Sequence, residues 1–224
     1  MAQREVKQER AVRTRAALVT AAAEVFGELG FAGTTVAKIT ERAGVTLGAL
    51  YFHFKNKEEV AREIVRNQPR LVVPPRDSQG LQHAIDVTMT WARMLLDDPI
   101  LLAGARLVMD QEHFISKEEN SHGQWTQLLA EDFRTAQRKR ELRAKTDVDA
   151  LARLVVNACT GAQMHAHLES GRRDLPDRVE EMWQCLLPAI APPGAIARMR
   201  FDATSGDATS GDATLVGFTP GGAK

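Results

Sequence analysis

The 224-residue sequence has few cysteines, few aromatic side chains and no net charge. Its two cysteines, Cys159 and Cys185, lie in separate apolar stretches without a C-x-x-C pattern, so they do not form a thiolate zinc site. We expect both to be buried as small hydrophobic residues. The N-terminus lacks the apolar segment of a secretory signal, and no apolar run approaches the roughly 20 residues that span a bilayer. These absences predict a cytoplasmic protein without a membrane segment.

Motifs of common enzyme classes are also missing. The sequence contains no H-E-x-x-H, no G-x-S-x-G and no P-loop pattern. His165 and His167 lie in a predicted helix, where a spacing of two residues turns their side chains about 200° apart and prevents easy sharing of a metal. We therefore expect no catalytic residues, no metal ligands and no cofactor, although a helical enzyme remains an alternative from a different class.

The neutral total charge conceals an uneven distribution. Residues 1–70 hold 12 Lys and Arg against 8 Asp and Glu, a net charge of +4, and residues 71–224 hold 17 against 21, a net charge of −4. Cationic contacts to phosphates supply most non-specific affinity for DNA. The basic N-terminal part, with a basic arm at residues 1–11, is consistent with binding to nucleic acid, although a solvated imbalance of this size also arises by chance.

Helical periodicity dominates the sequence and predicts an all-α fold. Leu18, Ala22, Val25, Phe26 and Leu29 follow the spacing of one buried stripe, and Gly30 is placed to end that helix. Asn56 and Glu59 resemble a capping box at the start of another helix, which is expected to end before Pro69. The predicted helices are 12–29, 35–43, 47–53, 57–68, 81–96, 99–109, 123–140, 148–170 and 176–190, with a short turn after Pro193.

Ala43-Gly44-Val45-Thr46 has the properties of the corner in a helix-turn-helix. Gly44 supplies a positive φ, Val45 reaches the core, and Thr46 begins a second short helix at the surface. Small and polar residues at the start of that helix suit entry into the major groove of DNA, whereas an ordinary helix–helix corner is the alternative. The candidate residues for DNA contact are Thr34, Thr35, Thr46, Leu47, Gly48, Tyr51, His53 and Lys57.

The segment TTVAKITERAGVTLGALYFHFKNKEEVAREI resembles the DNA-binding signature of the tetracycline-repressor (TetR) family, most closely that of the γ-butyrolactone autoregulator receptors. ARLVMDQ at 105–111, GQWTQLL around Trp125, CTGAQ at 159–163 and LLPAIAPPG at 186–194 extend the resemblance to about residues 8–200. Position 47 departs from the pattern, because these receptors usually carry Lys where this chain has Leu47. A cation beside the phosphates is thereby lost.

The resemblance implies a repressor that binds a pseudo-palindromic DNA operator as a homodimer and is released by a small amphipathic lactone or butenolide. It implies that the last two long helices form the dimer interface, a role that suits the stripe Leu151, Leu154, Val155, Ala158, Gly161 and Ala162. It also implies an apolar ligand cavity with Trp125 as a wall and Gln68 and Thr160 as hydrogen-bonding groups. From helical faces alone we add Val87, Leu107 and Met164 as apolar lining.

The predicted organisation has three parts: a helix-turn-helix domain at 1–68, a helical ligand-binding and dimerisation domain at 69–201, and a disordered tail at 202–224. The polar stretch 110–122 is expected to be a loop, and the repeated DATSG of the tail is too polar to build a core. Two alternatives keep the DNA-binding head and change the ligand. One is a multidrug-sensing repressor, and the other is an orphan repressor that answers to an antibiotic or to no signal.

Overall fold

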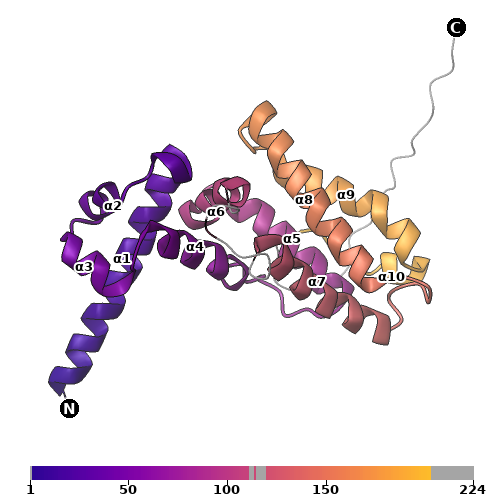
Figure 1. Ribbon diagram of the computed structural model, residues 1–224. Coiled ribbons are helices and arrows are strands. Elements are labelled where there is room, and N and C mark those ends of the chain that lie inside the picture. The colour runs from indigo at the N-terminus through magenta and orange to yellow at the C-terminus, as the bar shows by residue number, and fades with distance from the viewer. Residues whose placement is uncertain (1, 111–113, 115–119, 203–224) are drawn as a thin grey trace, which may run out of the picture.

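The computed structural model describes residues 2–110, 114 and 120–202, and every regular element within them is helical, as predicted (Figure 1). Helices α1 to α3 and the start of α4 form a head at one end, and α5 to α10 form the body beside it. The helices of the described part are α1 (Ala2–Gly33), α2 (Val36–Ala43), α3 (Leu47–His53), α4 (Lys57–Leu71), α5 (Leu81–Met94), α6 (Pro99–Asp110), α7 (Ser121–Arg138), α8 (Val148–Ser170), α9 (Leu175–Ile190) and α10 (Pro193–Ile196).

Local sequence signals set the short helices of the head. The Thr35 hydroxyl accepts a hydrogen bond from the Lys38 amide and begins α2, and Gly44 ends α2 in the left-handed conformation with φ 64°. Thr46 begins α3 in the same way, with its hydroxyl 3.2 Å from the Ala49 amide. The predicted helix-turn-helix corner is confirmed.

The clearest differences from the predicted helix boundaries are in α1, α4 and α7. Helix α1 starts at Ala2 rather than Val12, so the basic arm is helical, and it continues beyond a break at Gly30 (φ 69°) to Gly33. Helix α4 continues through Pro69 to Leu71, so the expected end before Pro69 is wrong. The proline ring fits the helical φ, removes one N–H hydrogen bond and crowds the carbonyl four residues earlier, and the helix ends two residues later. Helix α7 begins at Ser121 because the Asn120 side chain caps it.

Two hydrophobic clusters hold the described chain together. The body cluster centres on Trp183 of α9, whose indole Nε1 donates to the Thr88 hydroxyl at 2.8 Å and whose ring meets Phe133 edge-on. The head cluster includes Ala103 and Leu107 of α6 in addition to residues of α1 to α4. The head therefore rests on α6, and the predicted boundary at residue 68 lies inside α4 rather than between elements. Residues 203–224, which hold nearly all of the predicted tail, lie outside the described residues.

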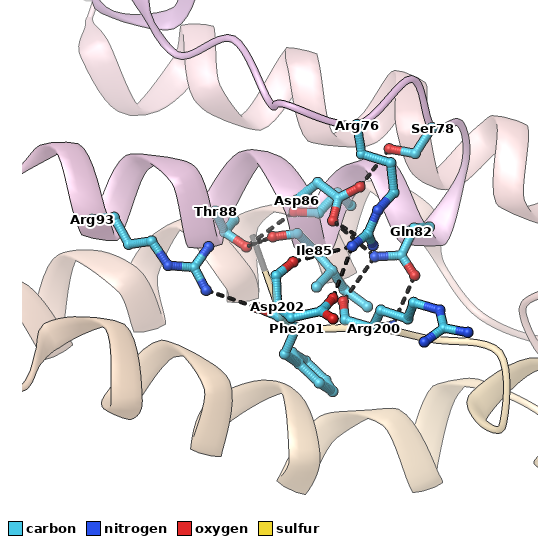
Figure 2. A network of polar contacts seen from close by, with 11 residues as sticks. Arg76, Ser78, Gln82, Ile85, Asp86, Thr88, Arg93, Arg200, Phe201 and Asp202 are labelled. Carbon is cyan, nitrogen blue, oxygen red and sulfur yellow. Dashed lines mark hydrogen bonds and ion pairs between the residues drawn. The ribbon is translucent and has the colours of Figure 1, made fainter. Parts of the chain in front are cut away.

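A polar network fixes the connector between α4 and α5 to the body (Figure 2). Arg76 donates from Nη1 to the Asp86 carboxylate at 3.3 Å and from Nη2 to the Asp202 carboxylate at 2.9 Å. Gln82 of α5 forms two hydrogen bonds with the backbone of Arg200, at 2.8 and 2.9 Å. The chain that follows α4 and the segment 200–202 are thus held side by side on α5.

One described helix is long and apolar enough to cross a membrane, the part of α1 from Gln8 to Gly33. Charged residues divide this helix into short apolar runs, so its overall apolar character is not evident from run length in the sequence. Leu18, Ala22 and Phe26 of this helix are fully buried in the head cluster. Its apolar stripe therefore serves the core of the head.

Candidate DNA-binding head and ligand cavity

Helix α3 presents its N-terminal part to solvent. Thr46, Leu47, Gly48 and Tyr51 are exposed, whereas Leu50 on the opposite face is completely buried. Gly48 stands in open space, since a Cβ added there would have only the Thr46 hydroxyl within 4 Å, at 3.9 Å. Nothing within the described chain requires glycine at this position. Because glycine has no side chain, a partner can approach the backbone of α3 closely at this position.

The structure places two of the predicted DNA-contacting residues inside the head. Thr34 is buried and donates its hydroxyl to the Gly30 carbonyl at 2.7 Å. The Lys57 ammonium donates to the carbonyls of Phe31 and Thr34 at 2.9 and 3.1 Å and lies 4.4 Å from the centre of the Phe31 ring. Both groups contact the end of α1 in this structure, and their bonding to phosphates stays a prediction. Thr35 is exposed and His53 half-buried.

Phe52 is an exposed aromatic residue that the sequence analysis did not select. Its side chain is 75% exposed, and its ring packs edge-on against His53. Phe52, His53 and Thr46 line a hollow whose other wall includes Arg10 and Thr14 of α1. The run of aromatic residues at 51–54 could have indicated this exposure. A seven-residue helix buries only one face, so some of these rings must lie in solvent.

A cavity of about 60 Å³ lies in the body, between the end of α4 and helices α5 to α8. Its walls are mainly apolar, with Trp91 and Trp125 as the aromatic members. Amide and hydroxyl side chains interrupt the apolar surface. The lining residues are Gln68, Thr88, Trp91, Leu101, Ala105, Val108, Ser121, His122, Trp125, Leu129, Val156, Cys159, Thr160 and Gln163.

The structure brings together three of the six residues predicted for this cavity, namely Gln68, Trp125 and Thr160. The other three lie elsewhere. Val87 is buried in the body core, Leu107 faces the head cluster, and Met164 is exposed at a separate surface hollow. Val87 and Leu107 are buried but contact other parts of the core, and Met164 faces solvent instead of the cavity. His122 and Gln163 line the cavity but were not predicted, although each lies three residues from a predicted member and so shares its helical face.

Most polar groups of the cavity have partners within the protein. The Thr160 hydroxyl donates to the Val156 carbonyl at 2.9 Å and therefore accepts from His122 Nε2 at 3.1 Å. Burial lowers the pKa of His122, which keeps the imidazole neutral at pH 7. The Gln68 amide is different. Its residue is only 4% exposed, and no hydrogen bond joins the amide to any described residue. It is the group best placed to bond a guest molecule.

The Gln68 amide packs directly against Gly104 of α6. A Cβ added at Gly104 would lie 1.1 Å from Nε2 and 2.2 Å from Cδ of Gln68. Any larger residue at position 104 therefore requires the end of the Gln68 side chain to move. The contact joins α4, which carries the head, to a wall of the cavity.

The two cysteines have different environments. Cys159 is buried and lines the cavity, as expected for a core residue, and burial raises the pKa of its thiol to about 12. Cys185 is exposed on α9, so the prediction that it is buried is wrong. The apolar residues around Cys185 misled the prediction, because they point to the other face of the helix, where Trp183 and Leu187 are buried.

We expect the Cys185→Ser variant, which retains only Cys159, to resist 5,5′-dithiobis(2-nitrobenzoic acid) at pH 7 while folded. The buried thiol stays protonated, and the thiolate is the reacting species. The same protein in guanidinium chloride should release one equivalent of thionitrobenzoate. Rapid reaction of the folded variant would show that the cavity is open to solvent near Cys159.

Metal chemistry has no support in the described part of the chain. No group of three or more His, Cys, Asp or Glu side chains there is arranged to hold a metal ion. His165 and His167 are both exposed on α8. The described head and cavity thus offer an exposed helix and a mainly apolar space.

Comparisons with known proteins agree with this arrangement. Residues 18–64 match the model of bacterial regulatory proteins of the tetR family, and residues 78–192 match a tetracyclin repressor-like C-terminal domain. The chain belongs to the tetR family. It is 36% identical to the A-factor receptor protein of Streptomyces griseus over 194 residues, which are 87% of this chain and 70% of that protein. These relatives are transcriptional regulators, so the chain is not an enzyme.

Solved structures extend the similarity to the whole fold. TylP, a tetR regulator from Streptomyces fradiae, matches with a TM-score of 0.79 and 38% identity over 87% of this chain and 94% of that one. CprB from Streptomyces coelicolor, solved with its biological operator sequence, matches with a TM-score of 0.67 and 31% identity over 84% and 94%. Both the head and the body of this chain therefore have counterparts in tetR regulators of known structure.

Proposed function

We propose that this protein represses transcription as a homodimer on a pseudo-palindromic operator and leaves the DNA when a γ-butyrolactone or butenolide-like molecule occupies the cavity. The observation that carries the proposal is the contact of Gln68 and Gly104, which connects the cavity wall to the helix of the head. The match to the A-factor receptor extends through head and body. We place the protein in the cytoplasm, where its operator lies.

Dimerisation through α8 and α9 is supported by apolar residues that the single chain leaves uncovered. Leu154 and Leu168 of α8 are 53% and 82% exposed on one helical face. Gly161 lies between them, and nothing lies within 4 Å of an added Cβ. Leu151 and Val155 of the predicted stripe are instead buried in the chain's own core. A two-fold dimer of this kind presents two α3 helices to half-sites about one helical turn apart, or a multiple of it.

Gly48→Ala is expected to change stability and DNA affinity in opposite directions. Glycine inside a helix costs about 0.5–1 kcal/mol relative to alanine, and the added methyl group has free space, so the variant should be more stable. The same methyl group should keep α3 from the bases and weaken operator binding. Thermal unfolding and a gel shift measure the two effects. Unchanged operator affinity would place another part of α3 against the DNA.

Leu47→Lys is expected to make operator binding more dependent on salt. Leu47 is exposed at the first turn of α3, where a lysine would reach a phosphate. The slope of log K against log salt concentration should steepen by about one per subunit, because each new phosphate contact releases about one counterion. Fluorescence anisotropy on a labelled operator across a salt series gives both slopes. Equal slopes for the two proteins would show that residue 47 does not lie beside a phosphate of the DNA.

The cavity chemistry supports a small amphipathic ligand. Its surface is mainly apolar, and the Gln68 amide offers both a donor and an acceptor for a ring carbonyl or hydroxyl group. A change of a two-state equilibrium from 1:99 to 99:1 requires about 5.5 kcal/mol of differential binding. Several apolar contacts and one or two hydrogen bonds supply that amount. A cavity of about 60 Å³ holds only a few water molecules, so side chains move apart when a larger ligand enters.

A multidrug-sensing repressor is the second candidate. Among the described lining residues, Trp91 and Trp125 are the large aromatic side chains, and this small number favours a specific ligand over a promiscuous aromatic cage. A gel shift on the DNA upstream of the protein's own gene decides between the candidates. Release by synthetic γ-butyrolactones, including A-factor, or by butenolides supports the proposal, and release only by cationic drugs or antibiotics supports the alternative. No preference for any genomic fragment over random DNA would overturn both.

A further inference from the structure

A second hollow of about 630 Å³ lies on the surface between α1, α6 and α8, outside the cavity described above. We call it the α1–α6–α8 groove. Leu102 of α6 and Met164 of α8 give it apolar surface, and three basic side chains also line it, Arg106, His167 and Arg172. An apolar wall beside the two guanidinium cations is an arrangement that accepts an amphipathic anion.

The two guanidinium groups of the groove have no carboxylate partner among the described residues. Arg106 donates from Nη1 to the carbonyls of Gly27 and Glu28 at 2.7 and 3.1 Å. Arg172 donates from Nε to the Gln163 amide oxygen at 3.3 Å. The two carboxylates that also line the groove, Glu24 and Glu28, are bound by Arg42 at 3.0 and 2.8 Å.

The electrostatic environment agrees with an excess of positive charge. Partial burial lowers the pKa of Arg172, because its cation lacks the hydration of a surface arginine. The positive charge of Arg172, then partial burial and the charge of Arg106, lower the pKa of His167. The charges of both guanidinium groups therefore act on the His167 imidazole. An anion in the groove would neutralise this charge.

We propose that the α1–α6–α8 groove binds the carboxylate or sulfonate of a small amphipathic molecule, with Arg172 and Arg106 as cationic partners and Leu102 and Met164 against the apolar part. The site goes beyond the proposed function, since its occupation requires neither an operator nor a ligand in the cavity. Ala105 and Gln163 line both spaces, so they form the partition between the groove and the cavity. An anion that engages Arg106 competes with the α1 carbonyls and thereby weakens the contact of α6 with the head.

The test compares two fluorescent probes of nearly the same shape on the full-length protein. 1-Anilinonaphthalene-8-sulfonate carries the anionic group, and N-phenyl-1-naphthylamine lacks it. We expect Arg172→Gln to weaken binding of the sulfonate about tenfold, the value of one charge-assisted hydrogen bond. Binding of the neutral probe should change less than about twofold. Arg172→Lys, which keeps the charge but not the planar group, should retain most of the sulfonate affinity.

Three results would overturn the proposal. Equal losses for both probes would mean that Arg172 only supports the fold around Gln163. Sulfonate binding that is insensitive to Arg172→Gln and to added salt would place the probe elsewhere. Binding that rises when Leu154→Glu disrupts the dimer would show that the second copy of the chain covers the groove. None of these results depends on operator binding, so the proposed repressor function is tested separately.

Discussion

Gly104→Ala is expected to lower the free energy of unfolding by about 1–3 kcal/mol, the usual cost of an overpacked core. The new methyl group would occupy the position of the Gln68 amide, which lies 1.1 Å away at Nε2. We expect the displaced amide to turn into the cavity, because Gln68 is buried and lines that space. Urea unfolding followed by circular dichroism measures the loss. The same displacement should abolish release from the operator by A-factor or a related lactone.

Gln68→Ala provides the matched background for this prediction. Without the amide, the three atoms nearest to the new methyl group are removed, and Gly104→Ala gains helix propensity of about 0.8–1 kcal/mol. The substitution should therefore change sign, destabilising the native sequence and stabilising the Gln68→Ala protein. The difference between the two backgrounds is the coupling energy of the pair. An equal cost in both backgrounds would show that Gly104 meets a different neighbour.

Trp125→Ala is expected to abolish release by the ligand and leave operator binding intact. Trp125 is half-buried on α7 and forms an aromatic wall of the cavity, remote from α3. Loss of a central aromatic anchor costs about 2 kcal/mol or more, which is a thirtyfold loss of ligand affinity or greater. Gel shifts with a titration of A-factor and related lactones measure the change.

Trp125→Phe is the control for this experiment, because it keeps an aromatic wall and should retain most of the response. Circular dichroism and the thermal midpoint verify that both variants are folded. Loss of operator binding together with ligand release would indicate misfolding of the Trp125→Ala protein. Normal release of the operator by the alanine variant on addition of ligand would show that Trp125 does not contact the ligand.

The helix-turn-helix corner of the head was predicted from sequence, because its signals are local. A threonine cap, a left-handed glycine and a second threonine cap fix the corner within twelve residues, Thr35 to Thr46. The roles of Thr34 and Lys57 were not predictable in this way. Each uses its polar group on carbonyls at the end of α1, and the contact of Lys57 with Phe31 joins residues 26 positions apart. Helical periodicity carries no information about such a contact.

The cavity was predicted in part, because a helical face shows that a side chain is covered but not by which neighbour. Val87 and Leu107 are buried as their patterns indicate, yet Val87 packs in the body core and Leu107 against the head. Gln68 and Gly104 lie on different helices with 35 residues between them. Their contact depends on how α4 and α6 cross, a property of the packed molecule.

The attachment of Arg76 to Asp86 and Asp202 has a mechanical consequence for the release of DNA. The chain leaves α4 at Leu71 and is bound to α5 only a few residues later. The C-terminal end of α4 is therefore fixed to the body, whereas its N-terminal end is packed in the head. We expect a small rotation of α4 at the cavity to displace α3 by a larger amount, because α3 lies farther from the fixed end of α4.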